Sequence, residues 1–156
     1  MEPSESLLSE YFLSEQELEQ LMQHLIDEQA NASTLLAFTD KVEFEPGQVL
    51  IREGTPDASV FILTEGTLEV TVDDGGTGRR VATIKPYAIV GEQSFIDGGV
   101  RTATVTAKTN GIAHRLTDAG FEQVRSVHPE VACAFLVDVS RAMAQRLRQG
   151  KQRRRD

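Results

Sequence analysis

Residues 90–107 read VGEQSFIDGGVRTATVTA, a stretch that combines three glycines, one glutamate and one arginine. If residues 101–107 form a β-strand, the alanine and valine side chains lie on the same face as Arg101, and the three threonines lie on the other. An inward-facing Arg101 keeps its charge and therefore needs an anion. That anion can be a protein carboxylate such as Glu92, or a ligand phosphate held by two parallel hydrogen bonds.

The residues that precede Arg101 suit a small anionic ligand. Gly91 permits a sharp turn or a close approach to a ligand. Residues 93–96 could form one helical turn whose free amides face the space in front of Arg101, and such amides bind phosphate. The Glu92 carboxylate can accept a hydrogen bond from a hydroxyl. A cation, free amides and a carboxylate together match a cyclic nucleotide, which carries one phosphate charge and a free ribose hydroxyl.

The same residues carry a family resemblance. Gly91-Glu92, followed nine residues later by Arg101-Thr102-Ala103, resembles the phosphate-binding cassette of the cyclic nucleotide-binding domain family. That family includes catabolite activator proteins, regulatory subunits of cyclic AMP-dependent kinase and nucleotide-gated channels. Residues 44–47, 51–54 and 61–66 are also similar to turns of the family's barrel, so the resemblance covers about residues 42–148.

The resemblance implies a mainly β fold with flanking α-helices: an eight-stranded jelly-roll β-barrel with N-terminal helices and a long C-terminal helix. It implies that Glu92 binds the ribose hydroxyl and that Arg101 binds the cyclic phosphate. It also implies that the final helix moves over the base as a lid. The expected ligand-binding set is Gly91, Glu92, Gln93, Ser94, Arg101, Thr102 and Ala103.

Two positions depart from the family pattern without removing a ligand group. Gln93 stands where an apolar residue is more common, and Val100 stands where proline is frequent. Thr102 occurs with cyclic GMP binders, but serine or threonine there also occurs in bacterial cyclic AMP binders. Cyclic AMP is the expected ligand ahead of cyclic GMP, and no further cofactor is expected.

Four segments are expected along the chain: an acidic helical segment (1–40), a β-barrel (41–116) that contains the cassette (90–104), hinge and lid helices (117–149) and a basic tail (150–156). The chain has 24 acidic and 16 basic residues, a net charge of −8, with no Lys or Arg in the first segment. The basic tail is interpreted as a solvated helix end, with binding to nucleic acid, anionic lipid or an acidic partner as the alternative.

The N-terminal segment predicts a helix that begins with a capping box of Ser14 and Glu17. Residues 29–33 interrupt the apolar periodicity, so a second short helix is expected at residues 35–38. In the barrel, residues 60–63 and 68–72 are expected to form a hairpin, and residues 73–78 to form a glycine-rich loop tip.

Pro129 suits the start of a long amphipathic helix that continues to Gln149. Its apolar residues recur at three and four positions along one seam, formed by Ala132, Leu136, Val139, Met143 and Leu147. The seam could close over the barrel or pair with a second copy of the chain as a homodimer. Cys133, within this helix, is expected to be a small buried residue.

Several function classes lack their sequence signals, so no enzyme is expected. The glycine-rich segment 73–78 is not followed by the residues of a phosphate-binding P-loop. Ser94 has no nucleophile-elbow glycines, and the three histidines share no metal-ligand spacing. Residues 1–10 lack a basic signal-peptide region, no apolar run is long enough to span a membrane, and a single cysteine suits the reducing cytoplasm.

Two other functions are considered as alternatives. Family members that read DNA place a helix-turn-helix domain after the long helix, and the present chain offers no segment for one, so DNA binding by this chain alone is not expected. A protein partner or a fused effector domain would then receive the signal. Alternatively, Glu92 and Arg101 form an internal ion pair in a degenerate fold, which acts as a ligand-independent interaction module through its acidic N-terminal helices.

Overall fold

The computed structural model describes residues 14–155, without the side chains of Leu25, Thr77 and the residues after Gly150. Expectations for residues 1–13 and for the side chains of the basic tail lie outside these described parts. Contacts divide the chain into two compact units, residues 1–34 and 35–156. Each unit is described by itself.

Helix α2 (Glu15–Leu36) is continuous, so the predicted break at residues 29–33 is wrong. Glutamine and alanine in that stretch are good helix formers and need no apolar face to continue the backbone hydrogen bonds. The capping box is confirmed: Ser14 N–H donates to Glu17 Oε2 at 2.8 Å, and Glu17 N–H donates to Ser14 Oγ at 3.2 Å. These bonds lower the pKa of the Glu17 carboxyl.

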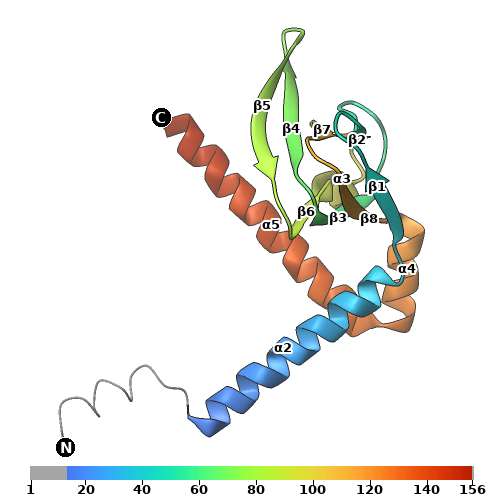
Figure 1. The fold of residues 1–156 in the computed structure, drawn as a ribbon, viewed down its shortest axis with the longest axis vertical. Helices are drawn as coiled ribbons and strands as arrows, with labels where there is room; N and C mark the ends of the chain where they lie inside the picture. Colours follow the sequence, from blue (N-terminus) through green and yellow to red (C-terminus); the bar gives the residue numbers. More distant parts are fainter. Residues whose placement is uncertain (1–13, 156) are drawn as a thin grey trace, which may run out of the picture. The chain divides into compact units, whose positions relative to one another are not determined.

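The second unit contains two four-stranded antiparallel sheets (Figure 1). One sheet has the order β1-β8-β3-β6, and the other has the order β2-β7-β4-β5. The strands are β1 (Asp40–Phe44), β2 (Val49–Ile51), β3 (Val60–Glu65), β4 (Leu68–Asp74), β5 (Thr77–Ile84), β6 (Ala88–Val90), β7 (Thr104–Ala107) and β8 (Gly111–Leu116). The jelly-roll fold is confirmed, although within residues 14–155 no ladder closes the two sheets into one barrel.

The hairpin expected from residues 60–63 and 68–72 is wrong. Strand β3 pairs with β6 and β8, whereas β4 pairs with β5 and β7 in the other sheet. The chain therefore crosses between sheets at Gly66, whose φ is +90°. The observed hairpin is β4–β5, and its tip is the pair Gly75-Gly76, with φ of +70° and +93°, as a tight primed turn requires.

Two apolar clusters form the core. The first lies between the sheets and includes Phe61, Leu63 and Leu68. The second joins the outer face of β3 and β8 to helices α4 (Asp118–Val127) and α5 (Pro129–Arg155). Both helices begin as expected, and the Thr117 hydroxyl caps α4 by accepting from Gly120 N–H at 3.1 Å. Because α4 and α5 share this core with β3 and β8, one face of each helix packs against these strands.

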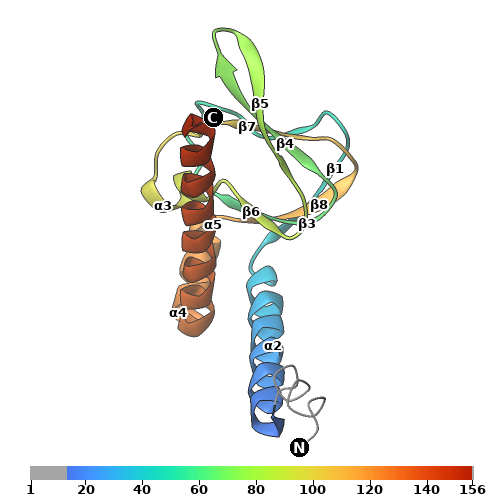
Figure 2. The same cartoon turned by 90° about the vertical axis from the view of Figure 1, so that its left-hand side faces the viewer.

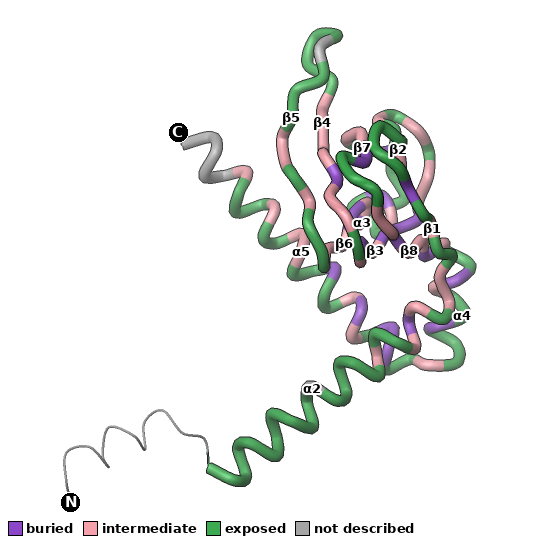
Figure 3. The backbone as a smooth tube through the Cα atoms, viewed as in Figure 1, coloured by how far each residue is buried: buried purple, intermediate pink, exposed green. Residues whose placement is uncertain are grey.

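The predicted apolar seam of α5 is buried only in its first half (Figure 3). Ala132 and Val139 are buried, whereas Leu147 is 70 % exposed. Cys133 is exposed, and so the expectation of a buried cysteine is wrong. Successive helix residues are rotated by about 100°, so that Cys133 turns away from the core that buries Ala132.

Helix α3 (Glu92–Asp97) follows β6 and lies beside α5 (Figure 2). This short helix and the loop before β7 form the middle of the expected cassette. Within the described residues, no helix is both long and apolar enough to cross a membrane.

Candidate functional site

Helix α3 occupies residues 92–97, where the sequence predicted one helical turn at residues 93–96. It lies between two glycines in the left-handed region: Gly91 has φ +82° and Gly98 has φ +71°. A Cβ at Gly91 would lie 2.7 Å from Arg101 Nη1 and 3.0 Å from Ile51 Cδ1, whereas a Cβ at Gly98 would meet nothing within 4 Å. Gly91 is therefore required both for the turn and for the close approach of Arg101.

Arg101 is buried, with 2 % of its surface exposed, as the sequence predicted. It lies in the loop before β7 and not in a strand, because its backbone bonds with the loop after β2. Its N–H donates to Thr55 O at 2.9 Å, and its carbonyl accepts from Gly54 N–H at 2.8 Å. The inward direction was predicted correctly, although the strand that was used to predict it starts only at Thr104.

The Arg101 guanidinium is held by protein oxygens. Nη1 donates to Gly91 O at 3.0 Å, and Nη2 donates to Ser59 O and lies 3.3 Å from Asp57 Oδ2. Among the described residues, Nε has no hydrogen-bond acceptor, although it is buried. The carboxylate beside Arg101 is therefore Asp57, and not the Glu92 that the sequence offered as a candidate.

Sequence reasoning missed Asp57 and Ser59, which lie just before β3 and contact the Arg101 guanidinium. Asp57 Oδ1 accepts from Ser59 N–H at 3.0 Å and from Ser59 Oγ at 2.8 Å. Ser59 Oγ also accepts from Arg115 Nε at 3.2 Å. The pattern Asp-x-Ser, in which an Asp side chain bonds the backbone two residues on, was the available signal. Nothing local in that pattern points to an arginine 42 or more positions away.

The pKa of the Asp57 carboxyl lies below its ordinary value. Partial burial acts to raise this pKa, but the hydrogen bonds from Ser59 and the positive charge of Arg101 together outweigh it. A carboxyl with a depressed folded-state pKa stabilises the fold above its unfolded pKa, about 3.9, and loses that contribution as the pH falls through the folded value.

Asp57→Asn is therefore expected to lower the free energy of unfolding at pH 7, and the difference from the wild type should shrink at pH 3. Urea unfolding at the two pH values measures both differences. A deficit of equal size at pH 7 and pH 3 would show that the charge of Asp57 contributes nothing and that only its shape matters.

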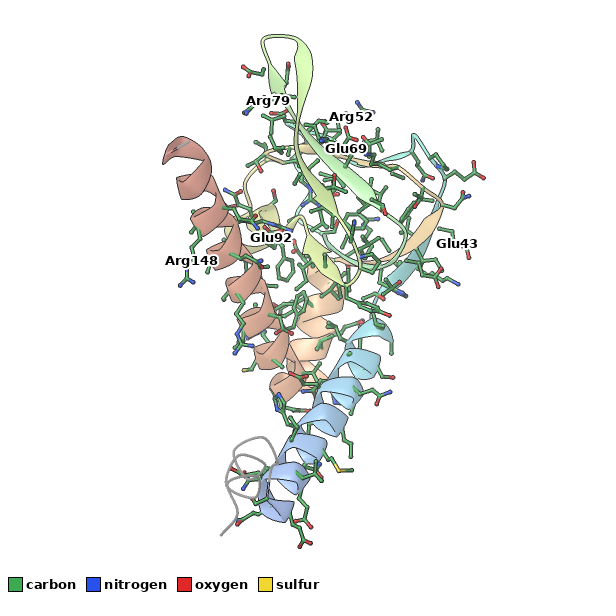
Figure 4. All side chains as sticks on the ribbon, turned by 60° about the vertical axis from the view of Figure 1, so that its left-hand side comes forward. Glu43, Arg52, Glu69, Arg79, Glu92 and Arg148 are labelled. Carbon is green, nitrogen blue, oxygen red and sulfur yellow. The ribbon has the colours of Figure 1, made fainter. Side chains whose placement is uncertain are left out.

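Glu92 begins α3 and is buried, with 5 % of its surface exposed. Its Oε1 forms an ion pair with Nη1 of Arg146 from α5, and Arg146 Nη2 donates to Ile89 O at 2.6 Å. Figure 4 shows Glu92 beside α5, with Arg148 of the same helix extending away from the sheets. Sequence reasoning missed the contact of Arg146, because nothing local distinguishes this residue from the other arginines near the end of α5.

The remaining predicted residues lie around α3. Thr102 Oγ1 lies 3.4 Å from Gln93 Oε1 at the surface. Ser94 is buried, and its hydroxyl donates to Val100 O at 3.2 Å, which closes the loop between α3 and Arg101. Ala103 is half-buried just before β7. The structure thus brings Gly91, Glu92 and Arg101 together in the interior, while Gln93 and Thr102 form the exposed edge of the same segment.

The residues of the site offer a cation, a carboxylate and a short helix, and no cluster of three metal-ligating side chains is found within residues 14–155. This set can bind a small anion that also carries a hydroxyl group. The Ser94 hydroxyl, the side chain that the sequence raised as a possible nucleophile, instead donates to the backbone carbonyl of Val100.

Comparison with known proteins identifies a matching family and several relatives. Residues 41–128 match the family described as "Cyclic nucleotide-binding domain". Curated relatives include a regulatory subunit of cAMP-dependent protein kinase and a cGMP-dependent protein kinase. The regulatory subunit of cAMP-dependent protein kinase from Dictyostelium discoideum is 32 % identical over 72 residues, which are 44 % of this chain and 22 % of that protein. The chain spans about a quarter or less of the length of the curated relatives it matches.

Solved structures support the same fold. The N-terminal domain of a transcriptional regulator from Streptomyces coelicolor is 31 % identical, with a TM-score of 0.63, covering 79 % of this chain and 86 % of that one. A cyclic nucleotide-binding domain from Methylobacillus flagellatus has a TM-score of 0.73 at 22 % identity, covering 80 % of this chain and 70 % of that one. At this identity, the similarity is one of fold. With more than half of its residues matched, the chain belongs to the cyclic nucleotide-binding domain family.

Proposed function

We propose that this domain is a non-catalytic sensor that binds cyclic AMP, in preference to cyclic GMP, and passes the signal on through α5. The observation that carries the proposal is a pair of buried, oppositely charged side chains on one short segment. Glu92 lies at the start of α3, and Arg101 follows nine residues later. A cyclic nucleotide offers a group that each side chain can bind: an anionic phosphate for the guanidinium and a hydroxyl donor for the carboxylate.

The contacts of Arg101 favour a ligand-binding site over a degenerate fold. A guanidinium has five N–H donors, and the buried Nε has no acceptor among the described residues. A buried donor without an acceptor costs free energy, which a bound phosphate oxygen would recover. Glu92, moreover, pairs with Arg146, and Arg101 lies beside Asp57, so the direct Glu92–Arg101 ion pair of the degenerate alternative is not the arrangement found.

The preference for cyclic AMP is supported by the likeness to the cyclic AMP-dependent regulatory subunit, although cyclic GMP-dependent kinases are also similar. Thr102 is compatible with either ligand. The single cysteine, exposed at Cys133, supports a reducing cytoplasm as the setting. The receiver of the signal, in this proposal, is a protein partner or a fused effector domain, and homodimerisation through α5 is one route.

The route from the cassette to α5 uses aromatic contacts. The ring of Phe95 in α3 packs edge-on against Phe121 of α4, with centroids 5.2 Å apart, and against Phe135 of α5, with centroids 5.9 Å apart. A ligand that shifts α3 therefore moves a side chain embedded between both helices. Ligand binding then shifts the population of α5 positions without any change in covalent structure.

Calorimetric titration of the purified chain with cyclic AMP, cyclic GMP and linear AMP tests the proposal. We expect micromolar or tighter binding of cyclic AMP, weaker binding of cyclic GMP and no binding of linear AMP. Stronger binding of cyclic GMP would overturn the ligand preference. If neither cyclic nucleotide binds to a folded sample that is free of carried-over ligand, the proposal that this domain is a sensor is wrong.

An interaction module is the second candidate function, favoured by the surface of α2. Four large apolar side chains on this acidic helix are each between 44 and 56 % exposed: Leu18, Leu21, Met22 and Ile26. They recur at three- and four-residue spacing, as on a helix face that binds a partner. Capture of a protein partner that is lost on removal of residues 1–34, and is insensitive to cyclic AMP, would favour this function.

A further inference from the structure

Arg146 reaches from the second half of α5 to the start of the cassette. Its Nη1 pairs with Glu92 Oε1, and its Nη2 donates to the carbonyl of Ile89, the residue before the last one of β6. The guanidinium thus bridges two points on either side of Gly91. The two partners differ in exposure: the Arg146 side chain is 38 % exposed, and the Glu92 side chain is 7 % exposed.

This difference in exposure determines how a ligand can reach Glu92. A carboxylate that is 7 % exposed has almost no surface left for a second hydrogen-bonding group from solution. The more exposed Arg146 is the group already in contact with that carboxylate. A hydroxyl that is to bind Glu92 must therefore take the place of the guanidinium.

We propose that Arg146 is an affinity-determining residue of this site: it holds the Glu92 carboxylate and is displaced when the ribose hydroxyl binds. The inference rests on the proposed function, since it needs a ligand that uses Glu92. Arg146 acts as an internal competitor, so that part of the binding free energy of the ligand is spent on breaking its contacts.

The displacement has a local consequence for α5. In the first half of the helix, Val131, Phe135 and Val139 are buried in the core shared with α4 and the sheet. In the second half, Leu147 is 70 % exposed and Arg148 is exposed (Figures 3 and 4). Loss of the Arg146 contacts would therefore loosen α5 after about Met143 and leave the first half in place.

The test compares Arg146→Gln with a matched control, Arg148→Gln, which removes the same charge two residues further along α5. Arg148 has no hydrogen bond or ion pair among the described residues and points away from the sheets. In calorimetric titration with cyclic AMP, we expect Arg146→Gln to bind about two- to fivefold more tightly than the wild type, the range of an ion pair with one partly exposed partner. Arg148→Gln should bind like the wild type.

Arg146→Lys is the second variant, and it keeps the charge but loses the planar fork that bridges Glu92 and Ile89. It should fall between the wild type and Arg146→Gln. Hydrogen exchange adds an independent readout: on addition of cyclic AMP, protection of residues 143–150 should fall in the wild type and stay unchanged in Arg146→Gln.

Equal or weaker binding by Arg146→Gln, with a wild-type melting profile, would overturn the inference and make Arg146 a structural contact or part of the bound state. The two proposals fail in different ways. If the wild type binds no cyclic nucleotide, the proposed function fails. If the wild type binds and Arg146→Gln gains nothing, only the role of Arg146 fails.

Discussion

Arg101→Ala is expected to weaken the binding of cyclic AMP by about a hundredfold or more, because two charge-assisted hydrogen bonds to phosphate are lost, each worth about 1.5–3 kcal/mol. Arg101 is the buried cation of the cassette, with 2 % of its surface exposed. Calorimetric titration of the wild type and the variant measures the change. Arg101→Lys should also bind poorly, since lysine keeps the charge but cannot form two parallel bonds.

The variant needs a control for folding, since Arg101 also bonds the carbonyls of Gly91 and Ser59. Circular dichroism and urea unfolding establish the folded fraction before titration. Arg115→Ala provides a matched control, because Arg115 bonds the Ser59 hydroxyl at 3.2 Å and lies outside the cassette. Wild-type affinity in folded Arg101→Ala would place the phosphate elsewhere and would remove the central element of the proposed site.

Gly91→Ala is expected to lower the free energy of unfolding by about 3 kcal/mol, through the cost of a left-handed alanine and of an overpacked contact. Gly91 has φ +82°, and a Cβ there would lie 2.7 Å from the Arg101 guanidinium and 3.3 Å from Ser59 O. The clash falls on buried groups that are themselves hydrogen-bonded, so they cannot move away freely. Urea denaturation of the variant and the wild type gives the difference.

Gly98→Ala is the matched control for this prediction. Gly98 closes the same short helix with φ +71°, but a Cβ there meets nothing within 4 Å. It should therefore cost only the backbone strain, about 1 kcal/mol. If the two variants lose the same stability, the close approach of Arg101 to Gly91 contributes nothing, and the glycine serves only the turn.

Local features of the sequence predicted much of the secondary structure. Ser14 and Glu17 cap α2 reciprocally, Pro129 opens α5, and residues 93–96 lie within α3. Each of these depends on groups within about four positions, so neighbouring residues carry the whole signal. The inward direction of Arg101 was also predicted from its neighbours, by the alternation of alanine and valine with threonine in residues 101–107, although the strand itself begins only at Thr104.

Pairings between distant segments could not be obtained in this way. Strands β3 and β4 both have the alternation and length of hairpin arms, and only the tertiary structure places them in different sheets. Alternation specifies which face of a strand is apolar, and not which strand lies beside it. The seam of α5 likewise predicted an apolar face along its whole length, although the sheets and α4 cover only its first half.

The sequence by itself identified the family, and it predicted the cassette and the two charged residues proposed to bind a cyclic nucleotide, because a ligand site requires particular side chains at a fixed spacing. Only the tertiary structure decided the partners of those residues: Asp57 and Ser59 for Arg101, and Arg146 for Glu92. Glu92 and Arg146 are 54 positions apart, and several arginines near the end of α5 carry the same charge. Which arginine meets the carboxylate depends on where the core fixes α5 and on the rotation of that helix, and neither is written in the local sequence.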